Sequence, residues 1–241
     1  VNLNFSPCCD IWTNPNNKVI GDRAFGKTAE SVEGNISAAI RGLHTGNVLA
    51  CAKHFPGHGC TTKDSHFDLP YVNKSLEDLR SEELKPFLKA SKSRAEFIMM
   101  AHLVVDAIDK ELPCTLSKKA YSFLRDELKF KKLIITDDME MKAISESFGY
   151  GESAKMALQA GADILLYRSL ETTKEAFESI QQDIKNQTIH KNELFDKIDR
   201  VIACKKRFFK EYNPIYIPSL SKEFKADRHK ALLERIAQDP S

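Results

Sequence analysis

Short apolar segments alternate along the chain with longer segments of helical periodicity. Four of the apolar segments are almost continuous runs of aliphatic and aromatic residues, which is typical of parallel strands covered on both faces. A fifth, at the start of the chain, places Leu3 and Phe5 on one face. The five predicted strands are Val1–Ile11, Val48–His54, Phe97–Leu103, Leu133–Thr136 and Ile164–Tyr167.

The segments between and after these strands repeat apolar residues every three or four positions. In the first of them, Val32, Ile36 and Ile40 form one stripe. Ser117 is placed to cap a later helix, and Gly161 is placed to end another. Alternating strands and helices indicate βαβ units and a parallel sheet. The predicted helices are Ala29–His44, Leu84–Ala90, Lys118–Leu128, Glu152–Ala160, Thr172–Asn186 and Asn192–Tyr212.

Polar side chains follow the carboxyl ends of these strands. Barrels and open sheets of the α/β class both keep their active sites at this edge. No G-x-G-x-x-G motif follows the first strand, as a dinucleotide-binding open sheet would require, so the pattern favours a barrel. The residues at this edge are Asp10, Lys53, His54, His102, Asp137 and Arg168.

The composition is that of an ordinary globular protein. The chain has 241 residues, of which 42% are hydrophobic and 29% charged, with a net charge of +2. This balance does not favour nucleic acid or an anionic membrane as a partner. No apolar run reaches the roughly 18 residues of a membrane helix. The six cysteines show no C-x-x-C spacing, so we expect reduced thiols and a cytoplasmic location.

The densest group of polar residues lies just after the second predicted strand. His54, His58, Asp64 and His66 together have donor types that suit Zn²⁺ or Fe²⁺. Alternatively, Asp64 and His66 act as a pair, because residues two apart in an extended segment point the same way. A carboxylate partner raises the pKa of an imidazole and makes it a usable acid at neutral pH. A glycine-rich turn separates the donors, so the pair is preferred over the metal site.

A second candidate is the pair of adjacent carboxylates at the end of the fourth predicted strand, Asp137 and Asp138. Adjacent side chains diverge, so at most one of them is expected to point into a barrel mouth. The other would cap a helix or form an ion pair. An acid on one loop and a carboxylate on a later strand end together suggest glycoside hydrolysis by double displacement.

These two segments also carry a family resemblance. The chain resembles the β-N-acetylglucosaminidase branch of the family 3 glycoside hydrolases, whose pattern K-H-[FI]-P-G-H-G is followed shortly by D-S-H. The resemblance extends over about residues 1–212. Its motifs here are N-F-S-P at 4–7, G-D-R-A-F-G at 21–26, K-H-F-P-G-H-G at 53–59, D-S-H at 64–66, A-H at 101–102, T-D-D-M-E-M at 136–141 and A-G-A-D-I-L-L at 160–166.

The resemblance implies an activity and a set of catalytic residues. Asp137 would be the nucleophile of a retaining enzyme, and His66, oriented by Asp64, would be the acid/base. The expected substrate is a small carbohydrate with a terminal β-linked N-acetylglucosamine, either an N-acetylglucosaminyl muropeptide from peptidoglycan or a chitooligosaccharide. Neither a cofactor nor a metal is implied.

The resemblance also implies sugar-binding residues. Lys53, His54 and Arg23 would bind sugar hydroxyls, whereas His58 is expected to be structural. Some relatives are phosphorylases, so phosphate stays open as an alternative acceptor to water.

The implied fold is a TIM-type (β/α)8 barrel, but only five of its eight strands are predicted here. The missing three would precede Val1, so we expect residues 1–218 to form an incomplete barrel domain. Residues 219–241 would form a charged helical tail, which is a candidate linker to a second domain. Two other functions remain open on the sequence alone. One is a metal-dependent hydrolase that uses His54, His58 and His66, and the other is a truncated, inactive sugar-binding fragment.

Overall fold

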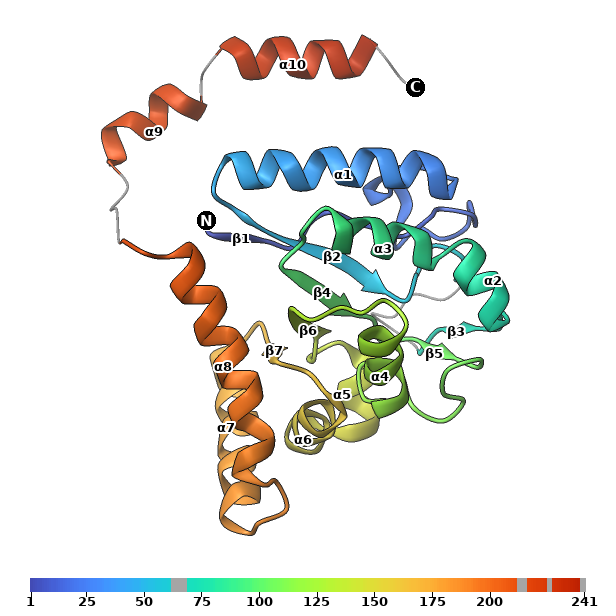
Figure 1. Cartoon of the computed structure of the whole chain (residues 1–241), viewed down its shortest axis with the longest axis vertical. Coiled ribbons are helices and arrows are strands. Elements are labelled where there is room, and N and C mark those ends of the chain that lie inside the picture. The colour runs from blue at the N-terminus through green and yellow to red at the C-terminus, as the bar shows by residue number, and fades with distance from the viewer. Residues whose placement is uncertain (62–68, 212–215, 225–226, 239–241) are drawn as a thin grey trace. The chain divides into compact units, whose positions relative to one another are not determined.

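A computed structural model of the chain describes residues 1–61, 69–211, 216–224 and 227–238. Its contacts divide the chain into two units, Val1–Cys204 and Lys205–Ser241. The first unit contains a five-stranded parallel sheet in the order β1-β2-β4-β6-β7 (Figure 1). The α/β class and the parallel sheet are therefore confirmed. The strands are β1 (Leu3–Asn4), β2 (Leu49–Phe55), β4 (Phe97–Met100), β6 (Leu133–Asp138) and β7 (Ile164–Leu166).

The prediction for the first strand is wrong in its length. The sequence predicts a strand over Val1–Ile11, but β1 contains only two residues. Pro7 interrupts the ladder because it has no N–H to donate. The segment nevertheless continues beside β2, since the Pro7 carbonyl accepts a hydrogen bond of 3.2 Å from the Lys53 N–H. An isolated parallel bridge also joins Cys8 to Lys53.

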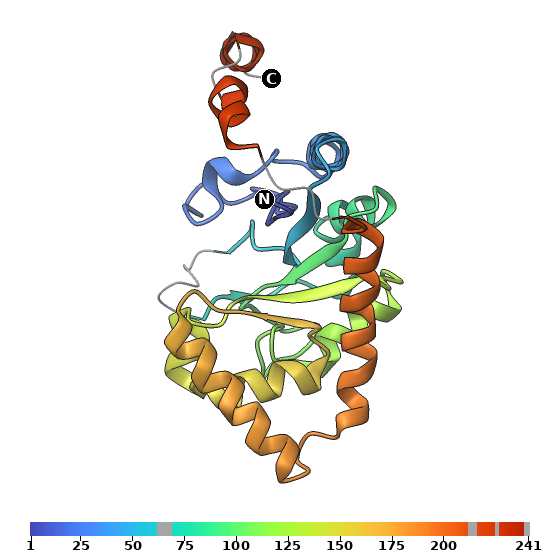
Figure 2. The same ribbon diagram turned by 90° about the vertical axis from the view of Figure 1, so that its left-hand side faces the viewer.

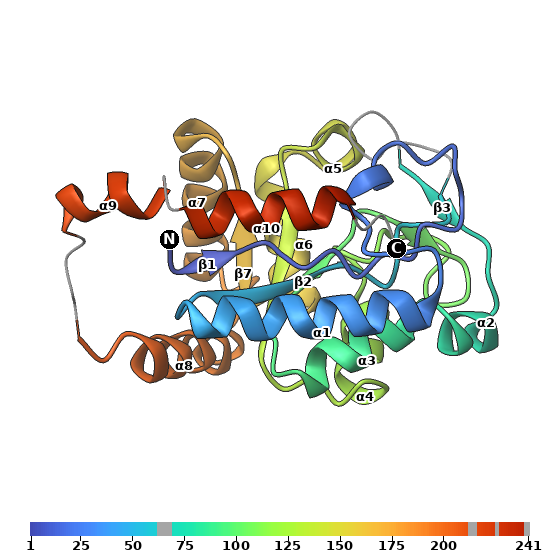
Figure 3. The same cartoon turned by 90° about the horizontal axis from the view of Figure 1, so that it is seen from above.

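Helices cover the sheet. α1 contacts β2 and α3, and α6 contacts β7, α4, α5 and α7. Figure 3 shows α1 running alongside β2, and Figure 2 shows β2, β4 and β6 following one another in a curved sheet. The helical elements are η1 (Gly21–Arg23), α1 (Ala29–Thr45), α2 (Leu76–Ser81), α3 (Leu84–Lys92), α4 (Lys118–Asp126), α5 (Lys142–Phe148), α6 (Tyr150–Ala160), α7 (Leu170–Lys185) and α8 (Lys191–Phe208).

The hydrophobic core lies between these helices and the sheet. The predicted stripe of α1 is confirmed, because Ile36 and Ile40 are fully buried. They share one core cluster with Ile98 of β4. The rings of Phe55 and Phe87 add an edge-to-face contact, with centroids 5.3 Å apart. The packing of α1 and α3 on the sheet therefore holds the end of β2, where the predicted site begins.

The predicted helix ends at Ser117 and Gly161 are also confirmed. The Ser117 hydroxyl accepts a hydrogen bond of 3.3 Å from the Ala120 N–H at the start of α4. Gly161 follows α6 with φ +139°, and a Cβ at this position would lie 2.9 Å from Tyr121. A side chain at residue 161 would therefore be strained and would collide with α4.

Several small elements were not predicted. The structure adds α2, α5 and a separate two-stranded parallel sheet formed by β3 (Tyr71–Val72) and β5 (Val104–Val105). Each has only two to seven residues, which is too short for a clear periodic pattern.

Residues 21–28 match the phosphate-loop spacing G-x-x-x-x-G-K-T, which by itself counts against a barrel. A phosphate loop lies between a buried strand and a helix, but here the segment begins with η1 and no strand directly precedes it. Packing explains the glycine at position 26 instead, because a Cβ there would lie 2.0 Å from the Ser31 hydroxyl. The Gly26 carbonyl also accepts a hydrogen bond from the Trp12 N–H. The match is therefore not a phosphate loop.

The second unit, Lys205–Ser241, contains the end of α8, α9 (Ile217–Phe224) and α10 (Asp227–Gln238). The contacts divide the chain inside α8, whereas the sequence predicts a boundary after residue 218. Within the residues described, none of the helices combines the length and apolar character needed to cross a membrane.

Asp163 provides a test of how the sheet edge at β7 is held. Its fully buried carboxylate accepts hydrogen bonds from Arg125, Arg200 and the Ile134 N–H, at 2.7 to 2.9 Å. We expect Asp163→Asn to lower the free energy of unfolding by about 3 kcal/mol, because both guanidinium groups lose their counter-charge. Urea unfolding at pH 7 measures this change. Asp199→Asn, at an exposed position of α8, is the control, and an equal effect of both variants would contradict the prediction.

Candidate active site

A pocket opens at the carboxyl ends of β2 and β6. Four predicted site residues line it: Arg23, Lys53, His54 and Asp137. They come from η1, β2 and β6, so the fold gathers side chains that lie up to 114 positions apart in the chain. The other lining residues are Phe5, Val19, His58, Met99, Met141 and Leu166.

The predicted catalytic pair, Asp64 and His66, lies outside the described residues. Its place relative to the pocket therefore stays a prediction. The described chain reaches Thr61 on one side of this segment and resumes at Leu69 on the other.

The two strands that supply the polar residues are irregular at the pocket. The pairing of β2 with β4 shifts between Ala52 and Phe55, and the pairing of β6 with β7 shifts between Ile135 and Asp138. Such irregularities redirect side chains and are common beside active sites. Lys53, His54 and Asp137 lie within these irregular stretches, and the neighbours Lys53 and His54 both line the pocket.

Asp137 is a partly buried carboxylate at the end of β6. Burial by itself would raise its pKa, but the charges of His54 and His102, a hydrogen bond from the Asp138 N–H and the charge of Lys53 outweigh that effect and lower it. The Asp138 N–H lies 2.8 Å from Asp137 Oδ1. The environment therefore keeps this carboxylate ionised, as a nucleophile or an electrostatic stabiliser of positive charge requires.

Asp138 has a different role from its neighbour. Its Oδ2 lies 2.5 Å from Nε of Arg168, and its Oδ1 accepts a hydrogen bond of 3.0 Å from the Glu140 N–H. Burial raises the pKa of Asp138, and the charges of Glu140 and Asp137 act in the same direction, against Arg168. The expectation that only one of the two carboxylates enters the pocket, while the other forms an ion pair, is confirmed.

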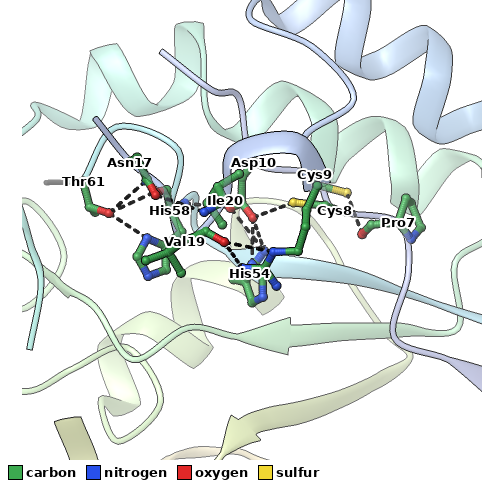
Figure 4. A network of polar contacts seen from close by, with 11 residues as sticks. Pro7, Cys8, Cys9, Asp10, Asn17, Val19, Ile20, His54, His58 and Thr61 are labelled. Atoms are coloured by element: carbon green, nitrogen blue, oxygen red, sulfur yellow. Dashed lines mark hydrogen bonds and ion pairs between the residues drawn. The ribbon is translucent and has the colours of Figure 1, made fainter. Parts of the chain in front are cut away.

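Behind the pocket lies the fully buried carboxylate of Asp10 (Figure 4). Its Oδ2 lies 2.7 Å from Nδ1 of His54 and 3.0 Å from Sγ of Cys8. Its Oδ1 accepts a hydrogen bond of 2.7 Å from the His58 N–H, and both oxygens lie within 3.3 Å of the His54 N–H. Burial would raise the pKa of Asp10, but these interactions, led by the charge of His54, hold it well below its usual range.

This network fixes which nitrogen of the His54 ring faces Asp10. An ionised carboxylate only accepts hydrogen bonds, so Nδ1 of His54 carries a proton and donates it to Asp10. Nε2 is then the ring nitrogen left for a ligand in the pocket. Asp10 therefore orients one of the predicted sugar-binding residues.

The loop that follows β2 is held by main-chain packing. A Cβ on Gly59 would lie 1.8 Å from the Ile11 carbonyl oxygen, and Gly57 has φ +131°, so both positions require glycine. Nδ1 of His58 lies 2.7 Å from the Thr61 hydroxyl, and the side chain of Asn17 donates to the His58 carbonyl at 2.6 Å. These contacts favour the structural role expected for His58.

Within the described residues, the one group of three or more metal-type donors that lie within reach of one another is Cys8, Asp10 and His54. These atoms already hydrogen-bond one another, and burial raises the pKa of the Cys8 thiol. The group therefore forms a hydrogen-bonded core cluster. The predicted set with Asp64 and His66 includes residues outside the described range, so the metal hypothesis stays a prediction.

Sequence reasoning noted Asp10 as a polar residue at a strand end but gave it no role. Its partners, His54 and His58, lie 44 and 48 positions later in the chain, and no spacing rule connects them. The apolar lining was missed entirely, because residues such as Met99 and Met141 resemble ordinary core residues in the sequence.

Comparisons with known proteins agree with this geometry. The model of the glycosyl hydrolase family 3 N-terminal domain matches residues 1–204. A beta-hexosaminidase of Methylococcus capsulatus is 35% identical over 188 residues, which are 78% of this chain and 55% of that protein.

Two solved structures are similar in fold and sequence. A glycoside hydrolase family 3 beta-N-acetylglucosaminidase from a Paenibacillus species is 38% identical, with a TM-score of 0.86 over 89% of this chain and 42% of its own. The beta-glucoside phosphorylase BglX is 26% identical, with a TM-score of 0.82 over 88% of this chain and 40% of its own.

The chain spans about half the length of the curated relatives it matches. The family match covers most of its residues and includes every element that lines the pocket. On this evidence, the chain belongs to glycosyl hydrolase family 3, whose N-terminal domain it matches.

Proposed function

We propose that the protein is a retaining exo-glycosidase that releases terminal β-linked N-acetylglucosamine from peptidoglycan-derived sugars. The observation that carries the proposal is the ionised Asp137 carboxylate in a pocket with Lys53, His54 and Arg23. Similarity to named beta-hexosaminidases and to a beta-N-acetylglucosaminidase supports the choice of sugar. A cytoplasmic location stays a prediction from the cysteine content.

In the proposed reaction, a carboxylate oxygen of Asp137 attacks the anomeric carbon. The bond from that carbon to the leaving-group oxygen breaks, and His66 donates its proton to this oxygen. A water molecule then attacks the covalent glycosyl-enzyme while His66 takes its proton, which releases the sugar and restores Asp137. Asp64 would orient His66 throughout.

The remaining polar groups of the pocket would bind the sugar. The Lys53 ammonium and the Arg23 guanidinium are donors suited to sugar hydroxyls, and Nε2 of His54 is the ring nitrogen left to hydrogen-bond one. A histidine acid becomes neutral rather than anionic after it gives up its proton. This property suits substrates with a carboxylate, such as the lactyl group of muropeptides, and it would also tolerate phosphate as the acceptor.

We further propose that the five-stranded sheet is part of a (β/α)8 barrel. Three more strands would close the barrel by pairing with its two edge strands, β1 and β7. These strands would come from this protein's own chain or from another. Closure would place a continuous rim of loops around the pocket.

Removal of the nucleophile is the direct test. In the purified protein we expect Asp137→Asn to lower hydrolysis of an aryl β-N-acetylglucosaminide by about 10³-fold or more, because an amide does not attack the anomeric carbon. Initial rates of aryl alcohol release measure this loss. Asp126→Asn, at an exposed position of α4, serves as the matched control. Near-normal turnover by Asp137→Asn would refute the proposed mechanism.

The acid role of His66 predicts a dependence on the leaving group. We expect His66→Ala to slow substrates with poor leaving groups by about 10²- to 10⁴-fold and activated aryl substrates far less, since protonation matters most for a poor leaving group. The measurement is kcat/KM over a series of aryl glycosides of graded leaving-group pKa. Equal losses across the series would remove His66 from the acid role.

The same purified protein can be used to test the metal-dependent hydrolase, the inactive binding fragment and the phosphorylase. Bound zinc or iron, together with activity lost to a chelator, would favour the metal-dependent hydrolase over the Asp64 and His66 pair. Sugar binding without turnover would favour an inactive binding fragment. Formation of a sugar 1-phosphate when phosphate is added would favour a phosphorylase, as BglX is named.

A further inference from the structure

His102 is a buried histidine that has no part in the proposed reaction. It follows β4, its side chain is almost completely buried, and it is not among the residues that line the pocket. Both ring nitrogens are used within the protein. Nε2 lies 2.9 Å from the Asp138 carbonyl oxygen, and Nδ1 lies 2.8 Å from the Thr115 hydroxyl.

The hydrogen-bond partners determine which nitrogen carries the proton. A carbonyl oxygen only accepts, so Nε2 of His102 must be protonated to bond the Asp138 carbonyl. Burial lowers the pKa of His102, which favours the neutral ring. The Thr115 hydroxyl lies 2.8 Å from Nδ1 and 2.8 Å from the Ala101 carbonyl oxygen. Thr115 thus holds the ring in place from the Nδ1 side while Nε2 bonds Asp138.

The bond from His102 reaches the main chain beside an irregular part of the sheet, where Asp138 pairs with Leu166 of β7. The pairing of β6 with β7 is irregular between Ile135 and Asp138. The hydrogen bond from His102 to the Asp138 carbonyl and the ion pair from Arg168 to its carboxylate add to the pairing there. Residue 138 is therefore held at its main chain by His102 and at its side chain by Arg168.

Anchoring Asp138 also anchors Asp137. The Asp138 N–H donates to Asp137 Oδ1 at 2.8 Å, so a shift of residue 138 would turn the Asp137 carboxylate. With Oδ1 occupied in this way, Oδ2 is the oxygen left to face a substrate. A nucleophile held in one orientation reacts faster than one that rotates, and a misplacement of about 1 Å can cost about 10²-fold in rate.

We propose that His102 is a positioning residue for the Asp137 carboxylate, which it holds through the Asp138 main chain while Thr115 supports the other side of the ring. The proposal rests on the proposed function, because it takes Asp137 as the nucleophile. His102 itself does not touch the substrate. What His102 contributes is its Nε2–H group, which is placed at the right distance and in the right direction to hold the Asp138 carbonyl.

Two amide substitutions separate this role from simple packing. The side-chain amide of His102→Gln reaches the position of Nε2 and keeps a donor for the Asp138 carbonyl, whereas that of His102→Asn reaches only the position of Nδ1. We expect His102→Asn to lower kcat/KM about 10- to 100-fold, with an equal loss for good and poor leaving groups. We expect His102→Gln to recover most of the activity. Circular dichroism and thermal unfolding establish that both variants are folded.

Thr115 offers a second pair of variants if His102→Asn does not fold. Thr115→Val removes the hydroxyl that faces Nδ1, and Thr115→Ser keeps it. We expect the valine variant to lose activity in the same leaving-group-independent way and the serine variant to retain it. The equal loss across leaving groups distinguishes both residues from His66, whose removal spares activated substrates.

Nitrogen-15 NMR of histidine-labelled protein tests the bond without relying on activity. The proposal requires a proton on Nε2 of His102 at pH 7, and a proton on Nδ1 alone would overturn it. Equal activity of His102→Asn and wild type, or equal impairment of His102→Asn and His102→Gln, would also overturn it. Turnover by Asp137→Asn would instead refute the proposed function, so the two failures are distinguishable.

Discussion

The buried carboxylate of Asp10 is the interaction on which the pocket depends. Removing an ionised carboxylate from water is costly unless its oxygens are satisfied. Here the donors come from the N-terminal segment, from the end of β2 and from the glycine-rich loop. Those three segments share one acceptor, so none can shift alone without leaving a buried charge unpaired. The orientation of His54 follows from this constraint.

The side of the pocket that carries Asp137 is built by a separate polar network. Glu140 accepts hydrogen bonds from the main-chain N–H groups of Arg168 and Ser169, each at 2.6 Å, and from the Thr172 hydroxyl at 2.8 Å. This network joins the loop after β6 to the start of α7. Each side of the pocket therefore has its own scaffold. β4 lies between β2 and β6 in the sheet, and His102 follows it.

Hydrophobic pattern alone predicted all five strands of the sheet, because parallel strands covered on both faces are almost continuously apolar. The same reasoning overestimated the first strand, since an apolar face at Leu3 and Phe5 does not reveal that Pro7 ends the ladder. The pocket residues were predictable where a polar side chain lies at the end of a predicted strand, as at Lys53, His54 and Asp137. The role of Asp10 was not, because it depends on contacts across more than 40 residues and on burial that appears only in the fold.

The adjacent carboxylates Asp137 and Asp138 show how the fold separates two chemically identical groups. The pKa of Asp137 is lowered because the charges of His54, His102 and Lys53 outweigh its burial. The pKa of Asp138 is raised because burial and two neighbouring carboxylates outweigh Arg168. A pair of acids whose pKa values are pushed apart usually has two different roles. The group that the environment keeps ionised faces the pocket, which supports Asp137 as the attacking carboxylate and assigns Asp138 to its support.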